Sequence, residues 1–530
     1  MHVKYSWVLA LLLSGCQLAQ PTSSDDNATS NIDSESVAVE ELSTPEESIT
    51  ATVSEPIEVV AEPAPIITPE SQEDVWQRIA MQLELEIPDN KTVDYYRTWY
   101  LKHPSHLRTV AKRAEPFLYL ITTKIEEQGL PLELALLPVV ESSFDAFAYS
   151  HGSAAGLWQF VPATGEMYGL TQNFWYDGRR DVSASTDAAL EFLTSLNKRF
   201  DGDWQLAIAA YNSGGGRVSS AMRKNRNVGK PVDFFSLSLP KETVGYVPKL
   251  LALADIVANQ EKYGITIPSI ANKPALTLID PKEQLDLAIA AKYAGISVKE
   301  LQGYNPAYNQ WATSPEGPHQ LLIPVDKAEQ FKQEVAKNRG KGMKLIRYKV
   351  ASGDTVSVLA EKYATTSSVI RNANNMTNNN LRAGQYIMIP TSTKDDQTYA
   401  LSATNRLAKT QSQSRGQYKV EHTVKSGDSL WTIARANKVS HQNLAKWNGM
   451  GPRDTLRIGQ KLVIWKSGDD GAIIRTVFYK VRSGDTISGI ASKFKVKSND
   501  VIKWNTLQQQ KYLKPGQQLK LYVDVTKVSV

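Results

Sequence analysis

Cysteine is almost absent from this chain, since Cys16 is the only one among 530 residues. A single cysteine cannot close an internal disulfide, which excludes a disulfide-stapled fold. The seven histidines are scattered without a His-x-x-x-His pattern, and no cysteine cluster accompanies them. The sequence therefore lacks the motifs that hold a metal, and we expect neither a metal nor any other cofactor.

Long hydrophobic runs are also lacking, and the apolar segment near the start is too short for a membrane helix. Residues 7–13 are apolar, follow Lys4 and lead into Leu13-Ser14-Gly15-Cys16, whereas a spanning helix needs about 20 such residues. The pattern resembles a bacterial lipoprotein signal peptide (1–15) with lipid attached to Cys16. The resemblance implies a membrane partner through that lipid and, with Gln17 next, an outer-membrane lipoprotein facing the periplasm. The alternative is an uncleaved anchor with an incidental cysteine.

Basic residues are missing from residues 17–74, which contain 14 acidic residues and no Lys or Arg. Such a segment buries too little apolar surface to fold, so 16–74 is predicted to be a disordered acidic tether. Without Lys4 and these acidic residues, the totals of 60 basic and 55 acidic residues leave about +18 on residues 75–530. No nucleic-acid motif accompanies this charge, and we expect no nucleic-acid partner. An anionic cell-wall polymer suits an exported protein better.

The C-terminal half contains an internal repeat. Three units open on Tyr348-Lys-Val-Ala-Ser-Gly-Asp, His422-Thr-Val-Lys-Ser-Gly-Asp and Tyr479-Lys-Val-Arg-Ser-Gly-Asp. Each has an asparagine at one offset (Asn374, Asn448, Asn505) and closes on a glycine followed by an apolar strand. The units resemble the LysM domain, a small α+β (βααβ) module that binds glycans containing N-acetylglucosamine. We predict modules at 346–391, 420–466 and 477–523, with linkers at 393–418 and 467–477.

Residues 275–325 resemble half of such a module. A helical pattern, Asn305-Pro306 and the apolar Leu321-Leu-Ile-Pro324 follow in the expected order, but the opening Ser-Gly-Asp is missing. We predict a degenerate LysM-like spacer.

Residues 75–256 show helical periodicity broken by Gly and Pro, without a run of alternating strands. The segment predicts an all-α unit in which 75–112 wraps a core domain at 113–256. The fold class is thus multidomain, with a mainly α domain before the small βααβ modules.

Glu141 is the candidate catalytic residue of the helical domain. It continues an apolar stripe with Leu134 and Leu137 at helical spacing, and Pro131 suits the first helical position. A poorly solvated carboxylate has a raised pKa, as a general acid at neutral pH requires. The alternative is that Glu141 ends its helix and simply reaches solvent.

Three further motifs follow Glu141-Ser142 in order. They are Gly156-Leu-Trp-Gln159, Ala210-Tyr211-Asn212 and Glu242-Thr-Val-Gly-Tyr246. Each alone is more often structural, but together they resemble the goose-lysozyme-like lytic transglycosylases of family 1. The resemblance implies a lysozyme-like catalytic domain that cuts the glycan strands of peptidoglycan. It also implies that Tyr246 orients Glu141, while Ser142, Gln159, Tyr211 and Asn212 bind substrate.

The resemblance further implies how one carboxylate suffices where most glycosidases use two. Glu141 protonates the oxygen between N-acetylmuramic acid and N-acetylglucosamine, and then deprotonates the muramic 6-hydroxyl, which closes onto its own anomeric carbon. The product is a 1,6-anhydromuramoyl end. Asp145 and Glu166 are the nearest candidates for a second carboxylate, but we expect a turn residue and a surface residue. Glu242 is expected to cap or pair locally.

In the LysM modules, the resemblance places sugar contacts in the loop after Ser-Gly-Asp and in the loop between the second helix and the second strand. The candidates in the first loop are Thr355, Ser429, Leu430, Thr486 and Ile487. The repeated Asp and Asn positions are expected to fix turns.

Two rival functions remain open at this point. A hydrolytic lysozyme-type muramidase would use water and a second carboxylate, and a non-catalytic peptidoglycan-binding lipoprotein would keep only the fold. All three readings share one partner, the glycan strands of peptidoglycan.

Overall fold

A computed structural model describes residues 67–150, 152–466, 474–508 and 512–524. The predicted signal peptide, Cys16 and most of the predicted tether lie outside these ranges. No helix within them is long and apolar enough to cross a bilayer.

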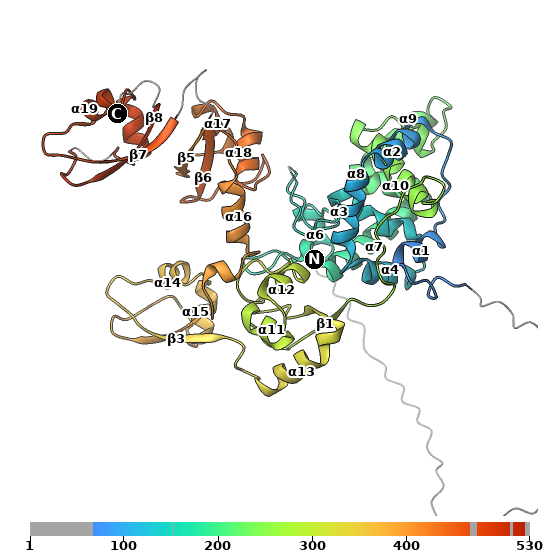
Figure 1. Cartoon of the computed structure of the whole chain (residues 1–530), viewed down its shortest axis with the longest axis horizontal. Helices are drawn as coiled ribbons and strands as arrows, with labels where there is room; N and C mark the ends of the chain where they lie inside the picture. The colour runs from blue at the N-terminus through green and yellow to red at the C-terminus, as the bar shows by residue number, and fades with distance from the viewer. Residues whose placement is uncertain (1–66, 151, 467–473, 509–511, 525–530) are drawn as a thin grey trace, which may run out of the picture. The chain divides into compact units, whose positions relative to one another are not determined.

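The first part of the described chain is helical, as the sequence predicted (Figure 1). Its α-helices are α1 (Val75–Ala80), α2 (Lys91–Lys102), α3 (Pro104–Ala114), α4 (Leu118–Glu126), α5 (Leu137–Ser142), α6 (Pro162–Met167), α7 (Val182–Arg199), α8 (Trp204–Ser213), α9 (Gly215–Arg226) and α10 (Lys241–Ala258). Short 3-10 helices occupy Leu132–Leu136, Gly178–Arg180 and Phe234–Ser236.

Aspartates begin several of these helices. The side chains of Asp181 and Asp203 accept hydrogen bonds from the first-turn N–H groups of α7 and α8, which otherwise lack partners. Helix α10 is apolar around most of its circumference and is buried over most of its length, in contact with α2 and α8. Residues on α10 therefore lie in the centre of the domain.

The segment before Glu141 is not one regular helix. Leu132–Leu136 is a 3-10 helix, and α5 begins only at Leu137. Pro138 in the first turn of α5 has no N–H to continue an α-helical ladder, which accounts for the change of helix type. Pro131 lies just before the 3-10 helix with an extended ψ of 134°, so its predicted place as first helical residue was wrong by one position.

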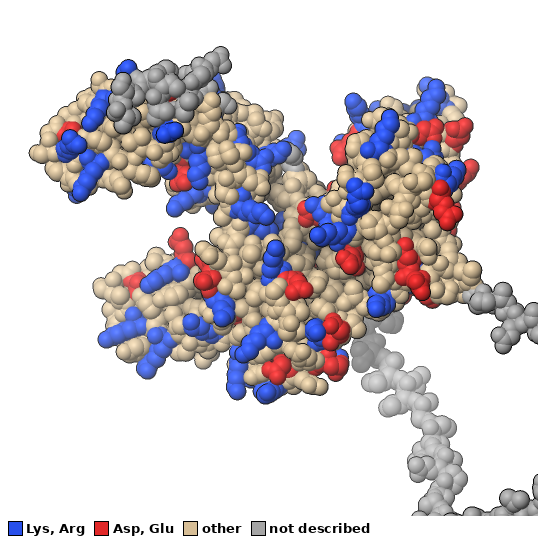
Figure 2. Space-filling view, in the orientation of Figure 1, with Lys and Arg blue, Asp and Glu red and all other residues tan. Residues whose placement is uncertain are grey.

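Each predicted LysM module has the strand–helix–helix–strand order, and its two strands pair antiparallel. The elements are β3 (Lys344–Lys349), α14 (Val356–Lys362), α15 (Ser367–Ala373) and β4 (Tyr386–Thr391); β5 (Tyr418–Thr423), α17 (Leu430–Ala436), α18 (His441–Trp447) and β6 (Lys461–Lys466); β7 (Ile474–Lys480), α19 (Ile487–Lys493), α20 (Ser498–Trp504) and β8 (Gln518–Asp524). Lys and Arg side chains are spread over the visible face of these modules (Figure 2).

The repeated asparagines tie the second helix of each module to its last strand. Asn374 donates to the carbonyls of Ile370 and Met388 and accepts from the Met388 N–H, all at 2.7 Å. Asn448 and Asn505 make the same three bonds in their modules. These residues are structural, as expected from the sequence, but they join a helix to a strand rather than fix a turn.

The spacer has the same architecture. Strands β1 (Leu276–Ile279) and β2 (Leu321–Pro324) pair around α11 (Leu287–Ala294) and α12 (Val298–Tyr304), and α13 (Ala328–Lys337) follows. Asn305 bonds Leu301 and Leu322 as the other asparagines bond their partners. The spacer therefore keeps the asparagine that joins the second helix to the last strand, although it lacks the Ser-Gly-Asp turn.

The segment 393–418, predicted as a linker, is largely ordered. It contains α16 (Ala403–Ser412), and Tyr399 before it is only 1% exposed. The Tyr399 hydroxyl donates to the buried Asp286 carboxylate of the spacer at 2.8 Å. One buried aromatic residue thus anchors a segment whose overall polarity indicated a linker.

Candidate active site

Glu141 lies in the last turn of α5, where the chain bends sharply. Ser143 and Phe144 both have positive φ, at 53° and 58°, which is uncommon for residues with side chains. Phe144 is 1% exposed and anchors this bend in the core. Glu141 itself is half-buried and keeps part of its surface accessible.

Tyr246 is the direct partner of Glu141. It comes from the buried middle of α10, is 4% exposed, and donates its hydroxyl proton to Glu141 Oε1. Because the phenol donates to the carboxylate, it fixes the orientation of the carboxyl group and favours the ionised form. The structure thus brings together two residues that are 105 positions apart in sequence.

The pKa of Glu141 is raised from 4.5 to about 7. Burial, which penalises the charged form, is the largest cause, and the hydrogen bond from Tyr246 opposes it. The nearby Glu242 carboxylate raises the pKa further, while the Lys249 ammonium lowers it. Both the protonated and the ionised forms of Glu141 are therefore accessible near neutral pH.

Two of the four predicted substrate-binding residues, Tyr211 and Gln159, bond to the backbone of the Gly156–Gln159 motif. The Tyr211 hydroxyl donates to the Trp158 carbonyl at 2.8 Å, and the Gln159 amide donates to the Gly156 carbonyl at 2.8 Å. Gln159 holds a positive φ of 50°. Its Oε1 atom accepts no hydrogen bond from any described residue.

The other two make local contacts. The Ser142 hydroxyl donates back to the Pro138 carbonyl of its own helix at 3.0 Å. Asn212 Oδ1 accepts from the Thr243 hydroxyl at 2.8 Å, which links α8 to α10 beside Tyr246. The Asn212 Nδ2 group makes no hydrogen bond within the described ranges, so it is available to a ligand.

Sequence reasoning missed the charged cluster that supports the Gly156 loop. A Cβ at Gly156 would lie 1.9 Å from the Arg179 carbonyl oxygen, so only glycine fits. The buried Arg179 guanidinium donates to both oxygens of Asp177 and to the Ser153 carbonyl. Burial alone would raise the pKa of Asp177, but hydrogen bonds and charge from Arg179 and Arg180 lower it. The sequence signal for this cluster was the charged run Asp177-Gly-Arg-Arg directly after Trp175 and Tyr176. Charged groups next to aromatic residues that become buried need partners of opposite charge.

The other carboxylates considered from the sequence do not pair with Glu141. Asp145 accepts from the Phe147 N–H at 3.0 Å and lies 3.6 Å from Arg113, as in a turn. Glu166 is exposed on α6. Glu242 is exposed in the first turn of α10, close enough to influence Glu141 by charge.

The predicted LysM contacts divide into two groups. Thr355, Ser429 and Thr486 are exposed, but their hydroxyls cap the helices that follow. Leu430 is 3% exposed and belongs to the module core, so the structure does not place its side chain on the surface, and Ile487 is half-buried. His422 bonds Asp428 at 2.8 Å, in the place where the other modules use a tyrosine.

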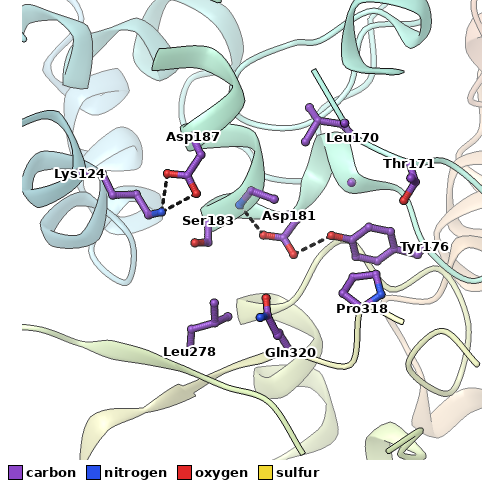
Figure 3. A pocket seen from close by; sticks show the side chains of 13 residues that line it. Lys124, Leu170, Thr171, Tyr176, Asp181, Ser183, Asp187, Leu278, Pro318 and Gln320 are labelled. Atoms are coloured by element: carbon purple, nitrogen blue, oxygen red, sulfur yellow. Dashed lines mark hydrogen bonds and ion pairs between the residues drawn. The ribbon is translucent and has the colours of Figure 1, made fainter. Parts of the chain in front are cut away.

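A cavity of about 380 Å³ lies away from Glu141, between the helical domain and the spacer. Figure 3 shows Asp181 there, accepting from Tyr176, and Lys124 paired with Asp187, opposite Leu278 and Gln320. Burial raises the pKa of Asp181. These polar groups already satisfy one another, so the cavity shows no catalytic arrangement.

Comparison with known families finds three models that match the chain. A transglycosylase SLT domain matches residues 120–234, and a LysM domain matches 348–390, 422–465 and 479–521. A model described as "Lytic transglycosylase MltD, LysM-like domain" matches 275–339, the degenerate module.

The chain is also similar to individual proteins. Membrane-bound lytic murein transglycosylase D of Escherichia coli (strain K12) is 35% identical over 85% of this chain and 86% of its own length. An autolysin of Enterococcus faecalis is 30% identical over 30% of this chain and 22% of its own. A crystal structure of an inactive mutant of the lytic transglycosylase Slt from Pseudomonas aeruginosa is 22% identical, with a TM-score of 0.22 over 28% of this chain and 25% of that one.

Proposed function

Because the chain belongs to the family of membrane-bound lytic murein transglycosylase D, and is thus a peptidoglycan lytic transglycosylase with LysM targeting modules, we propose that Glu141 performs both proton transfers. In the first, protonated Glu141 gives its proton to the oxygen that leaves with N-acetylglucosamine. The bond from that oxygen to the muramic anomeric carbon breaks.

In the second transfer, the Glu141 carboxylate accepts the proton of the muramic 6-hydroxyl. The 6-oxygen bonds to its own anomeric carbon and forms the 1,6-anhydro ring, so water is not consumed. The nucleophile is part of the substrate, and its high effective concentration replaces a positioned water. A pKa of about 7 suits a group that must act as acid and then as base.

Tyr246 and the motif residues have supporting roles in this proposal. The Tyr246 phenol holds the carboxyl group in one orientation throughout the cycle. Asn212 Nδ2 and Gln159 Oε1 contact the acetamido or hydroxyl groups of the sugars, since the other ends of both amides are already bonded to protein. Tyr211 positions the loop of Gln159, and Ser142 lines the sugar site.

The observation that carries the proposal is the hydrogen bond from the buried Tyr246 to the half-buried Glu141. Among the described residues, no second carboxylate is hydrogen-bonded to Glu141. The test is mass analysis of muropeptides after digestion of purified sacculi. We expect anhydro-terminated products, one water lighter than those of a lysozyme. Products that end only in reducing N-acetylmuramic acid would replace this proposal with the hydrolytic muramidase.

Attachment to the membrane is a separate proposal. The segment before Cys16 supports cleavage at that residue, lipid modification of its sulfur, and sorting to the outer membrane. Membrane fractions of cells that express the wild type and Cys16→Ser would test this. The wild type should fractionate with the outer membrane, and Cys16→Ser should not.

Charge supports the targeting role of the C-terminal half. Residues 341–530 contain 31 Lys and Arg but 12 Asp and Glu, so the excess of positive charge lies in the LysM half of the chain. We propose that this charge attracts the anionic wall while the loops of Thr355, Ser429-Leu430 and Thr486-Ile487 contact the glycan.

A further inference from the structure

A cavity of about 370 Å³ lies next to Glu141 and is formed by residues outside the four motifs. Val140 and Ser143, on either side of Glu141 in sequence, supply one wall. Helices α2 and α3 and the Lys249 side chain of α10 supply the rest. The N-terminal wrap therefore contributes a surface directly beside the catalytic carboxylate.

The α2 wall is aromatic and partly open. Tyr95 is 64% exposed and Trp99 is 37% exposed, although both are large apolar side chains. Trp99 stacks on His103 with ring centroids 4.4 Å apart, which gives it a defined orientation. Exposed, oriented aromatic rings beside a catalytic group offer a contact surface for a ligand.

The wall is held rigidly against α10. A Cβ at Gly245, the neighbour of Tyr246, would lie 2.3 Å from the Tyr96 hydroxyl oxygen, so the two helices touch at this point. Arg97 on α2 is also paired with Asp255 on α10. Helix α2, which carries the aromatic side chains, is thus packed directly against the helix that carries Tyr246.

Lys249 supplies a positive charge to the same cavity. Its ammonium lies 5.3 Å from the centroid of the Tyr96 ring, and no carboxylate of the described residues lies within 4 Å of it. The side chain is half-buried, which makes a missing counter-charge costly. The charge of Lys249 also reaches Glu141, so a ligand group held here lies near the scissile bond.

The chemistry of peptidoglycan identifies a partner for this cation. Its N-acetylated sugars are neutral where a stem peptide holds the lactyl carboxyl group of the muramic residue as an amide, whereas the stem peptides themselves bear carboxylates. We propose that the cavity binds the stem peptide of a muramoyl residue near the scissile bond, with a peptide carboxylate at Lys249 and the chain against Tyr95 and Trp99. The inference rests on the proposed function and adds a preference for peptide-bearing strands.

The experiment compares two soluble substrates: glycan strands that carry stem peptides, and the same strands after an amidase has removed the peptides and the freed lactyl carboxyl groups have been converted to neutral methylamides. The full-length enzyme, Lys249→Gln, Lys249→Arg and Trp99→Ala are assayed on both for kcat/KM. Lys224→Gln, an exposed lysine on α9, is the matched control. Circular dichroism checks the folding of each variant.

We expect Lys249→Gln to lower the ratio of kcat/KM between peptide-bearing and peptide-free strands roughly tenfold or more, as loss of a charge-assisted hydrogen bond does. Lys249→Arg should restore most of this ratio, Trp99→Ala should lower it less, and Lys224→Gln should leave it unchanged. Equal losses on both substrates would mean that Lys249 acts only through Glu141, and unchanged rates would mean that it binds nothing; either result overturns the inference. Failure of the proposed function would appear separately, as reducing-end products from the wild type.

Discussion

Glu141→Gln separates the catalytic role of this residue from its effect on folding. The amide keeps the size of the side chain and an acceptor oxygen for Tyr246, but it can neither donate the proton to the leaving oxygen nor take one back. General acid–base catalysis contributes roughly 10²–10⁴-fold in rate. Since one residue serves both steps, the loss should reach the upper end of that range or exceed it.

The same substitution should stabilise the protein, and the effect depends on pH. The folded-state pKa of Glu141 is about 7, against 4.5 without the surrounding protein. The folded protein therefore binds the proton more tightly than the unfolded chain, and wild-type stability falls as pH rises from 4.5 through 7. The difference between these two pKa values corresponds to up to about 3 kcal/mol. The glutamine variant has no such titration.

The assay is turbidity loss of purified sacculi, together with unfolding of both proteins at several pH values. All other titrating groups are shared, so the difference in unfolding free energy between variant and wild type isolates Glu141. This difference should grow between about pH 4.5 and pH 8. A folded variant that still clears sacculi would refute the catalytic assignment, and a difference that does not change with pH would refute the argument from burial.

Three other predictions follow from the site and the modules. Glu242→Gln removes a like charge and should lower the pKa of Glu141, so the fall of kcat/KM at alkaline pH should begin at a lower pH than in the wild type. Tyr246→Phe removes a hydrogen bond to the carboxylate and should raise the pKa of Glu141, so the same fall should begin at a higher pH. The pH–rate profiles of the two variants measure both changes. Asp145→Asn should keep substantial activity on sacculi, since Asp145 stabilises a turn, and an inactive but folded variant would revive the two-carboxylate lysozyme. A fragment of residues 341–530 should sediment with insoluble peptidoglycan at low salt, and removal of any module should weaken it through lost avidity; a fragment that stays in the supernatant would contradict the targeting role.

The βααβ modules were predictable from the sequence because the hydrogen bonds that hold each module together are local in sequence. Asn374 and its two partners lie within one short unit, and three copies repeat the same spacing. The spacer was identified only in part, since it lacks the opening turn motif and keeps the helical pattern, the asparagine and the closing apolar strand. Asn305 of the spacer makes the same bonds as the asparagines of the three LysM modules. The shared asparagine suggested this similarity, but only the structure shows the bonds.

The site residues on motifs were predictable, but their environment was not. Helical spacing placed Glu141 on an apolar face, while the partner Tyr246 came only from the family resemblance. The approach of α2 to Gly245 depends on packing between segments about 150 residues apart, which no local pattern records. Tyr95, Trp99 and Lys249 were missed for that reason, as was the anchoring of Tyr399 in a segment predicted as a linker.

In the proposed mechanism, one carboxylate does the work for which most glycosidases use two. Two carboxylates are useful when an acid must stay protonated while a base or nucleophile stays ionised, so their environments separate the two pKa values. In our proposal the acid and the base act in succession, so a single group with a pKa near neutral can serve as each in turn. Burial raises the pKa of Glu141 while the Tyr246 hydrogen bond limits the rise to about 7. The proposed mechanism then requires that the muramic 6-hydroxyl lie against Glu141. If the α2 wall binds the stem peptide as we propose, it helps to place the muramic residue and thereby contributes to the reaction.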